Sequence, residues 1–371
     1  MSEIKVSKLT NRAGTGAPNF SQGVKISGTA STLLAPTRTE SATEPTSPAN
    51  GDTWYDTDND TYDVYVDDEW KRFLGAGGGS GIAWGGERGV VFGGRSGSTR
   101  LNRIQYYAIP TTGNASDFGD LTVARDRSGG AVSNSTRAVC MAGANSSSAR
   151  VNVMDYITVS TTGNATDFGD CTQSRQGASA SDGSRGLRAK GYHQDYITTI
   201  EYITIATTGN ATNFGTVTNS VFAPAGVSDA TYGVFGGGSG NSNVMDYVTI
   251  QTTGNATDFG DLTEGRFPSG GCSDATRGLF WTGGSTSSKN VIDYITIATT
   301  GNATDFGDMT VSRAHGSANS DGTYGTCMGG EGSSVLNSIE YVTIQTTGNS
   351  ADFGDLLEVN NYPTASSGAA S

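Results

Sequence analysis

The sequence predicts an all-β fold, a six-bladed β-propeller of four-stranded blades that follows an N-terminal extension. The decamer TTGNATDFGD, or a close variant of it, occurs six times along the 371 residues. Neighbouring copies start 45–50 residues apart, which matches the period of propeller blades and exceeds that of leucine-rich and β-helical repeats. The six copies begin at Thr111, Thr161, Thr207, Thr252, Thr299 and Thr346.

Composition agrees with short strands joined by tight turns. Glycine accounts for 54 of 371 residues and charged residues for only 16%, so good helix formers are scarce and turn formers are plentiful. The runs YITIATT and YVTIQTT before the decamer are β-branched, which excludes a helical repeat of similar length.

One repeat, residues 276–323, contains all the expected parts of a blade. The apolar strand TRGLFWTGG ends in paired glycines, and a polar loop, STSSKN, separates it from the strand VIDYITIATT. The decamer turn and a strand of small residues complete the unit. Paired glycines permit positive φ and close backbone approach near a crowded propeller axis. They recur at Gly93–Gly94, Gly236–Gly237, Gly283–Gly284 and Gly329–Gly330.

The decamer itself is expected to be structural. Its Asn is expected to bond its own backbone in an Asx-turn. Its Phe is expected to be a ring wedged between adjacent blades, and burying one such ring contributes about 2–3 kcal/mol. The six rings are Phe118, Phe168, Phe214, Phe259, Phe306 and Phe353.

The ring is expected to close through its C-terminal strand. The first unit starts at RGVVFGG (88–94) without a preceding small-residue strand, and the chain ends with NNYPTASSGAAS, which matches the missing strand. Closure protects strand edges that would otherwise be free. Seven blades is the alternative, if GIAW (81–84) contributes a partial blade. In the third unit, RGLRAKGYHQDYITTI (185–200) replaces the Gly-Gly strand, which predicts a distorted blade or an altered loop.

These features resemble kelch-type propellers. The shared elements are the Gly-Gly strand, an acidic residue before Tyr, an aromatic residue about twelve positions later, and an Arg before the small-residue strand (Arg125, Arg175, Arg266 and Arg313). Phe stands where kelch repeats usually have Trp. Val221 and Asn360 occupy the Arg position in two units.

The N-terminal region has a different character, and four segments are expected. Residues 1–50 form an extended anchoring segment and linker, rich in Pro, Ser and Thr towards its end. Residues 51–74 form a small β-hairpin module, because aromatic and aliphatic residues alternate around Asp-Asn-Asp. Residues 75–81 are a glycine-rich linker, and residues 82–371 form the propeller.

This region resembles bacteriophage fibre proteins. LTNRAGTGAPNFSQGVKISG (9–28) looks like a segment that docks such proteins to a virion, and GDTWYDTDNDTYDVYVDDEW (51–70) looks like a hairpin common in phage fibres. The repeats are also similar to those of virion proteins of marine tailed phages. The resemblance implies a virion exterior location after assembly in the host cytoplasm, docking to other virion proteins through residues 1–50, and a homo-oligomer.

No catalytic site, cofactor or metal site is expected. The chain has two histidines, His193 and His315, in different repeats, whereas a Ser-His-Asp triad needs three positioned groups. The acids of the decamer recur between units, as Asp167/Asp170, Asp258/Asp261 and Asp305/Asp308, and are expected to be structural. DTDND (56–60) has Thr61 where a calcium loop requires Gly, so a solvated turn is favoured over a calcium site.

Charge and cysteines limit the possible partners further. The net charge is −13 and no basic stripe is visible, so a nucleic-acid partner is not expected. No apolar run is long enough for membrane insertion. The cysteines Cys140, Cys171, Cys272 and Cys327 are expected to be small buried hydrophobes rather than a disulfide framework.

The variable loops after the Gly-Gly strands are the candidate binding surface. They are expected to share one face of the disc, where function on rigid folds concentrates. Their residues suited to gripping sugars or acidic groups are Arg100, Arg150, Tyr192, His193 and Lys289. The preferred function is a tail-fibre-type adhesin for host-surface glycan. The alternatives are a structural capsid decoration or head-fibre knob, and an envelope-degrading hydrolase.

Overall fold

The chain divides into two units, Met1–Gly78 and Gly79–Ser371. The computed structural model describes residues 38–41, 45–47, 52–56, 61–66, 69–72, 86–128, 130–174, 176–192, 197–221, 224–268, 270–281, 283–284 and 289–369. The predicted anchor up to residue 37 and the linker at 75–81 lie outside these residues. Across the described part of the chain, every regular element is a β-strand.

The N-terminal unit contains a four-stranded sheet. Strands β2 (Thr53–Asp56) and β3 (Thr61–Val66) pair antiparallel, as the hairpin prediction requires, and β4 (Glu69–Arg72) continues the sheet. Strand β1 (Arg38–Ser41) pairs parallel with β2. The ordered module therefore begins before residue 51, inside the segment expected to be extended linker. The run RTES contains no proline and leaves its backbone free to pair.

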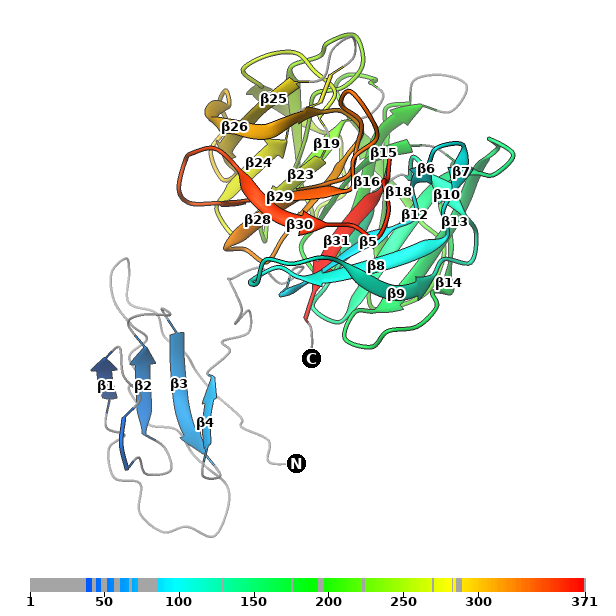
Figure 1. The fold of residues 1–371 in the computed structure, drawn as a ribbon. Helices are drawn as coiled ribbons and strands as arrows, with labels where there is room; N and C mark the ends of the chain where they lie inside the picture. Colours follow the sequence, from blue (N-terminus) through cyan, green and yellow to red (C-terminus); the bar gives the residue numbers. More distant parts are fainter. Residues whose placement is uncertain are drawn as a thin grey trace. The chain divides into compact units, whose positions relative to one another are not determined.

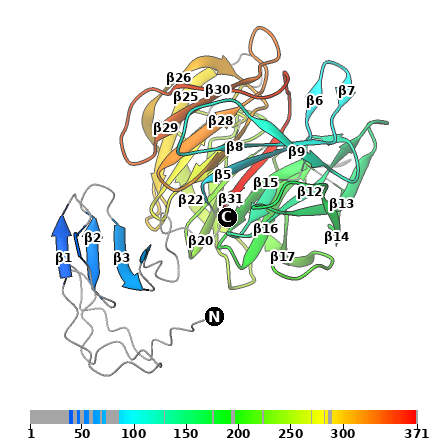
Figure 2. The same cartoon turned by 60° about the horizontal axis from the view of Figure 1, so that its bottom comes forward.

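The second unit is a six-bladed β-propeller, as predicted (Figures 1 and 2). Six four-strand paths make up its blades, numbered here from 1 to 6 in chain order. Blade 1 contains β31 (Thr364–Gly368), β5 (Arg88–Phe92), β8 (Arg103–Ala108) and β9 (Ser116–Asp120). Blade 2 contains β11 (Ala131–Ser133), β12 (Arg137–Asn145), β13 (Arg150–Thr158) and β14 (Thr166–Asp170), with β10 (Arg125–Asp126) also paired to β12.

The other four blades repeat this order without additions. Blade 3 contains β15 (Gln176–Ser181), β16 (Arg185–Tyr192), β17 (Thr199–Thr204) and β18 (Thr212–Thr216). Blade 4 contains β19 (Ala225–Ser228), β20 (Tyr232–Gly236), β21 (Val244–Thr249) and β22 (Thr257–Asp261). Blade 5 contains β23 (Gly270–Ser273), β24 (Arg277–Trp281), β25 (Lys289–Thr296) and β26 (Thr304–Arg313). Blade 6 contains β27 (Ser317–Ser320), β28 (Tyr324–Met328), β29 (Ser338–Thr343) and β30 (Ala351–Asp355).

The C-terminal strand closes the ring. Strand β31 pairs antiparallel with β5, so the two ends of the propeller lie side by side in blade 1 (Figure 1). The innermost strand of every other blade comes from its own repeat. Because blade 1 takes its innermost strand from the C-terminus, one sheet joins the first and last repeats, and neither repeat is left with an unpaired strand edge there.

Antiparallel pairing gives the disc two distinct faces. The loops between second and third strands, such as the hairpin of β6 (Arg95–Ser96) and β7 (Thr99–Arg100), lie on what we call the loop face. The turns between first and second strands, such as 134–136, lie on the opposite turn face. Strand β5 starts at the turn face, because it ends at the loop that connects it to β8. Strand β31 pairs antiparallel with β5 and therefore ends at the turn face.

The repeated decamer joins each blade to the next. In the junction of blades 1 and 2, Gly163 N donates to Phe118 O at 2.7 Å and Ala165 N donates to Asp120 O at 2.8 Å. The amide oxygen of Asn164 accepts the Asp120 N–H at 3.0 Å. The same Gly and Asn contacts occur in all six junctions, including that of blade 6 with blade 1. We call this set of contacts the clasp.

The clasp corrects the expected role of its asparagine. The sequence predicted that this side chain would bond its own backbone, but it accepts from the preceding blade instead. The equivalent residues are Asn114, Asn164, Asn210, Asn255, Asn302 and Asn349. Local turn chemistry could not reveal this contact, because the donor lies about one repeat away in the sequence.

The phenylalanine of the decamer is buried between blades, as predicted. Phe118 packs with residues of blades 1 and 2, including Ile104 and Ile157. Its ring meets Tyr106 edge-on at a centroid distance of 5.9 Å. Equivalent edge-on pairs accompany the other five rings, so each junction contains the same aromatic contact.

A layer of buried charge runs beneath the clasps. The acid before the repeat's Tyr accepts from a threonine of the preceding blade in five junctions, as when Thr122 Oγ1 donates to Asp155 at 2.6 Å. A buried cation then pairs with each acid: Arg125 with Asp155 at 2.8 Å, Arg266 with Asp293 at 2.5 Å, and Arg313 with Glu340. These are three of the four arginines that the repeat pattern predicts, and the fourth, Arg175, lies outside the described residues.

Blade 3 supplies the cations that pair with two further acids. Its second strand, β16, is continuous, and its pairing with β15 has an irregularity between Gln176 and Ala178. Residues 193–196 of the segment predicted to be distorted lie outside the described residues. Arg188 of this strand pairs with Glu201 of the same blade. Lys190 reaches into blade 4, where Val221 replaces the repeat's Arg, and its Nζ lies 2.8 Å from Asp246. Burial lowers the pKa of Lys190, and Asp246 opposes that shift.

Lys190 occupies a position that glycine fills in blades 1, 4 and 6. In blades 1, 2, 3, 4 and 6 the second strand ends in two successive residues of positive φ, namely Gly93 and Gly94, Ala142 and Gly143, Lys190 and Gly191, Gly237 and Gly238, and Gly329 and Gly330. In blade 4 this pair lies one residue later than the Gly236–Gly237 expected from the sequence. Lys190 has φ 58°, a strained conformation for a side chain with a Cβ, and the ion pair with Asp246 accompanies it.

The closing junction replaces charge with neutral groups. Gln105 stands at the acid position of blade 1, Asn360 at the Arg position and Leu357 at the Thr position. Leu357 N donates to Gln105 Oε1 at 2.7 Å, and Asn360 Nδ2 donates to Gly93 O at 2.8 Å. The acid, its cation and its threonine have thus changed together.

We expect Lys190→Met to lower the free energy of unfolding by about 3–5 kcal/mol, because it leaves the Asp246 carboxylate buried without its cation. Adding Asp246→Asn should recover at least half of that loss, since the closing junction is stable with neutral groups. Urea denaturation followed by circular dichroism measures both. If the double variant is no more stable than Lys190→Met alone, the pair is not the reason for the loss.

Candidate functional site

Four of the five predicted binding residues are described, and they lie at the loop face without forming one cluster. Arg100 ends β7, Arg150 begins β13 and Lys289 begins β25. Tyr192 ends β16 opposite Gln176, and His193 lies outside the described residues. These positions belong to blades 1, 2, 3 and 5, so they surround the rim rather than converge.

Arg100 and Lys289 each form an ion pair within the chain. Arg100 Nε lies 2.8 Å from Asp126 Oδ1, and the Arg100 side chain is only 8% exposed. Lys289 Nζ lies 2.5 Å from Glu264, and its side chain is 36% exposed. Arg100 is therefore a structural link between loops, while Lys289 remains accessible.

A polar cavity runs along the propeller axis. Its volume is about 170 Å³, and the innermost strands of all six blades line it with Ser, Ala and Gly. Near the turn face the blades present a ring of serines, Ser133, Ser181, Ser228, Ser273, Ser320 and Ser367. Their hydroxyls bond from blade to blade, as when Ser273 Oγ donates to Ser228 O at 2.7 Å. These hydroxyls are occupied by the fold.

The loop-face mouth of this cavity departs from the repeat. At the position two residues after the repeat's Arg, blade 3 has Gly177 and blade 5 has Pro268, while Ala223 of blade 4 lies outside the described residues. Blades 6, 1 and 2, which are consecutive around the ring, instead carry His315, Tyr362 and Arg127. All three line the cavity.

Each of the three residues has a left-handed backbone. Their φ angles are 60° for His315, 57° for Tyr362 and 50° for Arg127. Side chains other than Gly, Asn and Asp rarely adopt this region, and such strain is concentrated at functional sites. Three adjacent blades thus have a strained backbone at this position, and each places a side chain at the loop-face mouth of the cavity.

The three side chains form one stack. The rings of His315 and Tyr362 are stacked with centroids 4.3 Å apart. The guanidinium carbon of Arg127 lies 4.5 Å from the Tyr362 ring centre, and that of Arg95 lies 5.3 Å from it. Such cation–π contacts contribute on the order of 1 kcal/mol each and fix the orientation of the guanidinium group. We call Arg95, Arg127, His315 and Tyr362 the mouth cluster.

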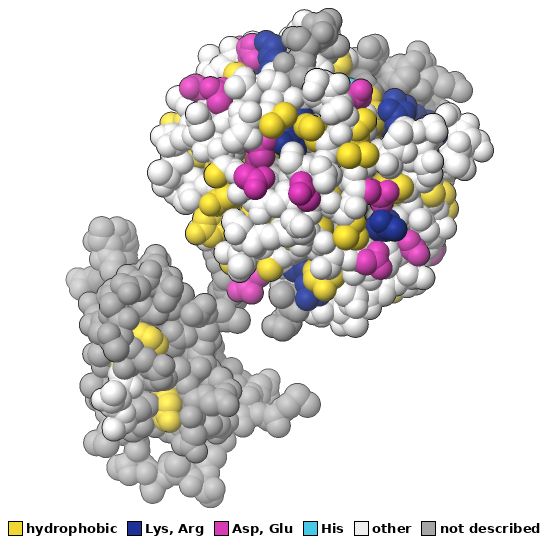
Figure 3. All heavy atoms as spheres, in the orientation of Figure 1, with side chains coloured by type: hydrophobic (Ala, Val, Ile, Leu, Met, Phe, Trp, Pro, Cys, Tyr) yellow, Lys and Arg dark blue, Asp and Glu magenta, His cyan; other side chains and the backbone are white. Residues whose placement is uncertain are grey.

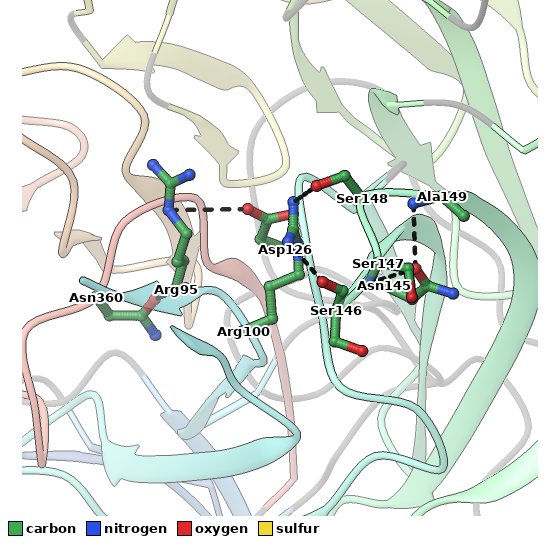
Figure 4. A network of polar contacts seen from close by, with 9 residues as sticks. All are labelled: Arg95, Arg100, Asp126, Asn145, Ser146, Ser147, Ser148, Ala149 and Asn360. Atoms are coloured by element: carbon green, nitrogen blue, oxygen red, sulfur yellow. Dashed lines mark hydrogen bonds and ion pairs between the residues drawn. The ribbon is translucent and has the colours of Figure 1, made fainter. Parts of the chain in front are cut away.

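Asp126 holds the edge of the mouth cluster in place. It lies between two arginines (Figure 4), with Arg100 Nε at 2.8 Å and Arg95 Nε at 4.0 Å, and its side chain is fully buried. Arg100 also donates to Ser148 Oγ of the neighbouring blade at 3.2 Å. Arg95 N donates to Asn360 Oδ1 at 3.0 Å. Loops of blades 1 and 2 are therefore locked together at this point.

Burial and neighbouring cations keep His315 neutral. The pKa of His315 is lowered to about 4, mainly by burial; Glu331 opposes the shift, and Arg127 and Arg95 contribute to it. Around the mouth, three guanidinium groups thus face the carboxylates of Asp126 and Glu331. Figure 3 shows charged side chains scattered among polar ones on the face in view, without a basic stripe.

Other candidate chemistry finds no support among the described residues. No group of three or more His, Cys, Asp or Glu is placed there to hold a metal. The predicted Asp-rich turn at 57–60 lies outside them. All four cysteines are free and buried, and burial raises the pKa of Cys272 and Cys327 to about 12. No helix in the described part of the chain has the length and hydropathy to cross a membrane.

Sequence reasoning missed most of the mouth cluster. His315 was noted only as a possible catalytic residue, and Arg95, Arg127 and Tyr362 were not singled out. The repeat alignment contained the signal, since large side chains replace Gly and Pro at one position in three units. That these units are adjacent depends on ring closure, which brings residues 127 and 362 into neighbouring blades.

Comparison with known proteins adds no relative. No protein-family model matches the sequence, and no curated protein is significantly similar to it.

His315 predicts a pH dependence of stability. Its pKa in the folded chain is about 4, below the ordinary value near 6.5, so the unfolded chain binds its proton first. As the pH falls from 6.5 to 4, protonation of this group should therefore lower the free energy of unfolding by about 2–3 kcal/mol.

The matched variant is His315→Gln, which retains all other titrating groups. Its free energy of unfolding should not show the decrease that protonation of His315 causes. Urea denaturation of both proteins at pH 7, 5.5 and 4.5 measures the difference. Parallel pH profiles for the two proteins would show that His315 is not held neutral by the fold.

Proposed function

We propose that this chain is a structural protein of a tailed-phage virion, attached to the particle through residues 1–50, whose propeller binds host-surface glycan at the loop face. In this account the protein is an adhesin and not an enzyme. The virion part is supported by the resemblance of 9–28 and 51–70 to phage fibre segments. The binding part is supported by the structure of the loop face.

The observation that carries the binding proposal is the mouth cluster. A purely architectural propeller needs no strained, charged side chains at one mouth of its axis, and blades 3 and 5 have Gly177 and Pro268 there. Adjacent blades instead supply Arg127, His315 and Tyr362 from positive-φ positions. A few precisely placed polar or charged groups at a concave site fix the orientation of a ligand, and these three side chains are placed in that way at the mouth of the cavity.

Chain direction supports the loop face as the binding face. The first described residues of the propeller, Gly86 and Glu87, precede β5 at the turn face. The chain therefore enters β5 at the turn face, at the end of the propeller opposite to the mouth cluster. Several copies on one particle would add avidity to weak single sites.

A test of this proposal uses one introduced cysteine, because the four native cysteines are buried. Ser98 is exposed on the loop face and Ser135 on the turn face. Full-length Ser98→Cys and Ser135→Cys proteins would each be coupled to polyethylene glycol and applied to an array of bacterial capsular polysaccharides and lipopolysaccharides.

We expect saturable binding of the unmodified protein to some glycans, at least tenfold weaker binding after modification at residue 98, and unchanged binding after modification at residue 135. Absence of binding to any glycan by multimerised protein, or equal loss from both faces, would contradict the proposal.

A further inference from the structure

The mouth cluster has more positive charge than its partners neutralise. Arg100 is committed to Asp126 at 2.8 Å, whereas Arg95 lies 4.0 Å from the same carboxylate. Arg127 contacts the Tyr362 ring. In a chain of net charge −13, one arginine that lines a polar cavity, Arg127, and a second beside the same Tyr362 ring, Arg95, mark an unusual local environment.

Several polar atoms at this mouth have no hydrogen-bond partner within the protein. Three of them are Arg127 Nε, Gln176 Oε1 and Arg95 Nε, the last of which lies 4.0 Å from Asp126 Oδ2, itself without a hydrogen-bond partner. Gln176 lines the same cavity, and only 9% of it is exposed. Buried polar groups are nearly always satisfied, so an unsatisfied set around one opening needs an explanation. A ligand that accepts from arginines and donates to an amide oxygen would satisfy all three.

We propose that the loop-face mouth binds an acidic sugar of the uronic acid class, with its carboxylate held by Arg127 and Arg95 and its hydroxyls directed to Gln176 and the cavity. Arginine matches a carboxylate because its planar group can donate two parallel hydrogen bonds. The sugar hydroxyls supply both donors and acceptors, which suits the mixture of amide and hydroxyl groups lining the cavity.

Charge and size narrow the ligand further. Asp126 and Glu331 flank the arginines, so a monoanion suits the site better than a doubly charged phosphate. The cavity volume of about 170 Å³ is below the roughly 300–1,000 Å³ of drug-sized sites. It therefore accommodates one sugar unit at the end or side of a chain. The inference rests on the proposed function only for the source of that sugar, a host-surface glycan.

The two histidines of the chain make a direct test possible. Full-length protein with ¹³C-labelled histidine gives ring signals from His193 and His315 alone, and His315→Gln assigns them. We expect sodium glucuronate, titrated at constant ionic strength, to shift the His315 signal saturably through the contact of Arg127 with Tyr362. Glucose at equal concentration should leave the signal in place.

Two variants serve as the matched pair. Arg127→Gly places in blade 2 the residue that blade 3 has, and we expect it to weaken glucuronate binding at least tenfold. Arg103→Gln removes the same charge from an ion pair with Glu358 elsewhere on the loop face, and we expect unchanged binding. The inference is overturned by no saturable shift with glucuronate, by equal binding of glucose, or by an Arg127→Gly protein that binds as well as the parent.

These results are distinguishable from those of the glycan array. Glucuronate binding by a protein that binds no bacterial glycan would support the acidic-sugar site and contradict the adhesin. Array binding that Arg127→Gly does not weaken would support the adhesin and contradict this site.

Discussion

The clasp between blades is the interaction on which the rest of the structure depends. Each blade buries its Phe ring only because the next blade lies against it, and the Gly and Asn contacts of the decamer hold the two backbones at that distance. The approach is too close for a side chain, since a Cβ at Gly119 would lie 2.3 Å from Gly163 O. Six equal junctions close the ring, and closure places the innermost strands around one axis and the mouth cluster at one end of it.

The buried ion pairs near the clasps do not follow the repeat in every junction. Blade 4 has no arginine for Asp246, and Lys190 of blade 3 fills that role from a strained backbone position. The closing junction has neither acid nor cation, and Gln105 bonds a backbone N–H instead. Because a lone buried charge costs several kcal/mol, losing one member of such a set requires a change in its partners, and both exceptions follow that rule.

The period and the β-branched strands were sufficient to predict the six blades, the closure by residues 360–371 and the buried Phe rings. Contacts between repeats were not predictable in the same way. The Asn164 side chain bonds Asp120 rather than its own turn, and Lys190 pairs across a blade boundary, because both partners are set by the ring and not by local sequence. The candidate site also combines local and long-range features. That the variable loops share one face was predictable from the sequence, whereas the ion pair of Arg100 with Asp126 was not. The cluster of Arg127, His315 and Tyr362 forms because ring closure makes blades 6, 1 and 2 neighbours.

The most direct test of the clasp compares two glycines that face each other in the junction of blades 3 and 4. A Cβ at Gly215 would lie 2.0 Å from Gly254 O, whereas a Cβ at Gly254 would have no atom within 4 Å. We expect Gly215→Ala to lower the free energy of unfolding by about 2 kcal/mol or more, through overpacking, and Gly254→Ala to change it by less than about 0.5 kcal/mol. Urea denaturation of the two variants beside the parent protein measures this difference. Equal stability of the two variants would contradict the claim that backbone contact between decamers holds the blades together.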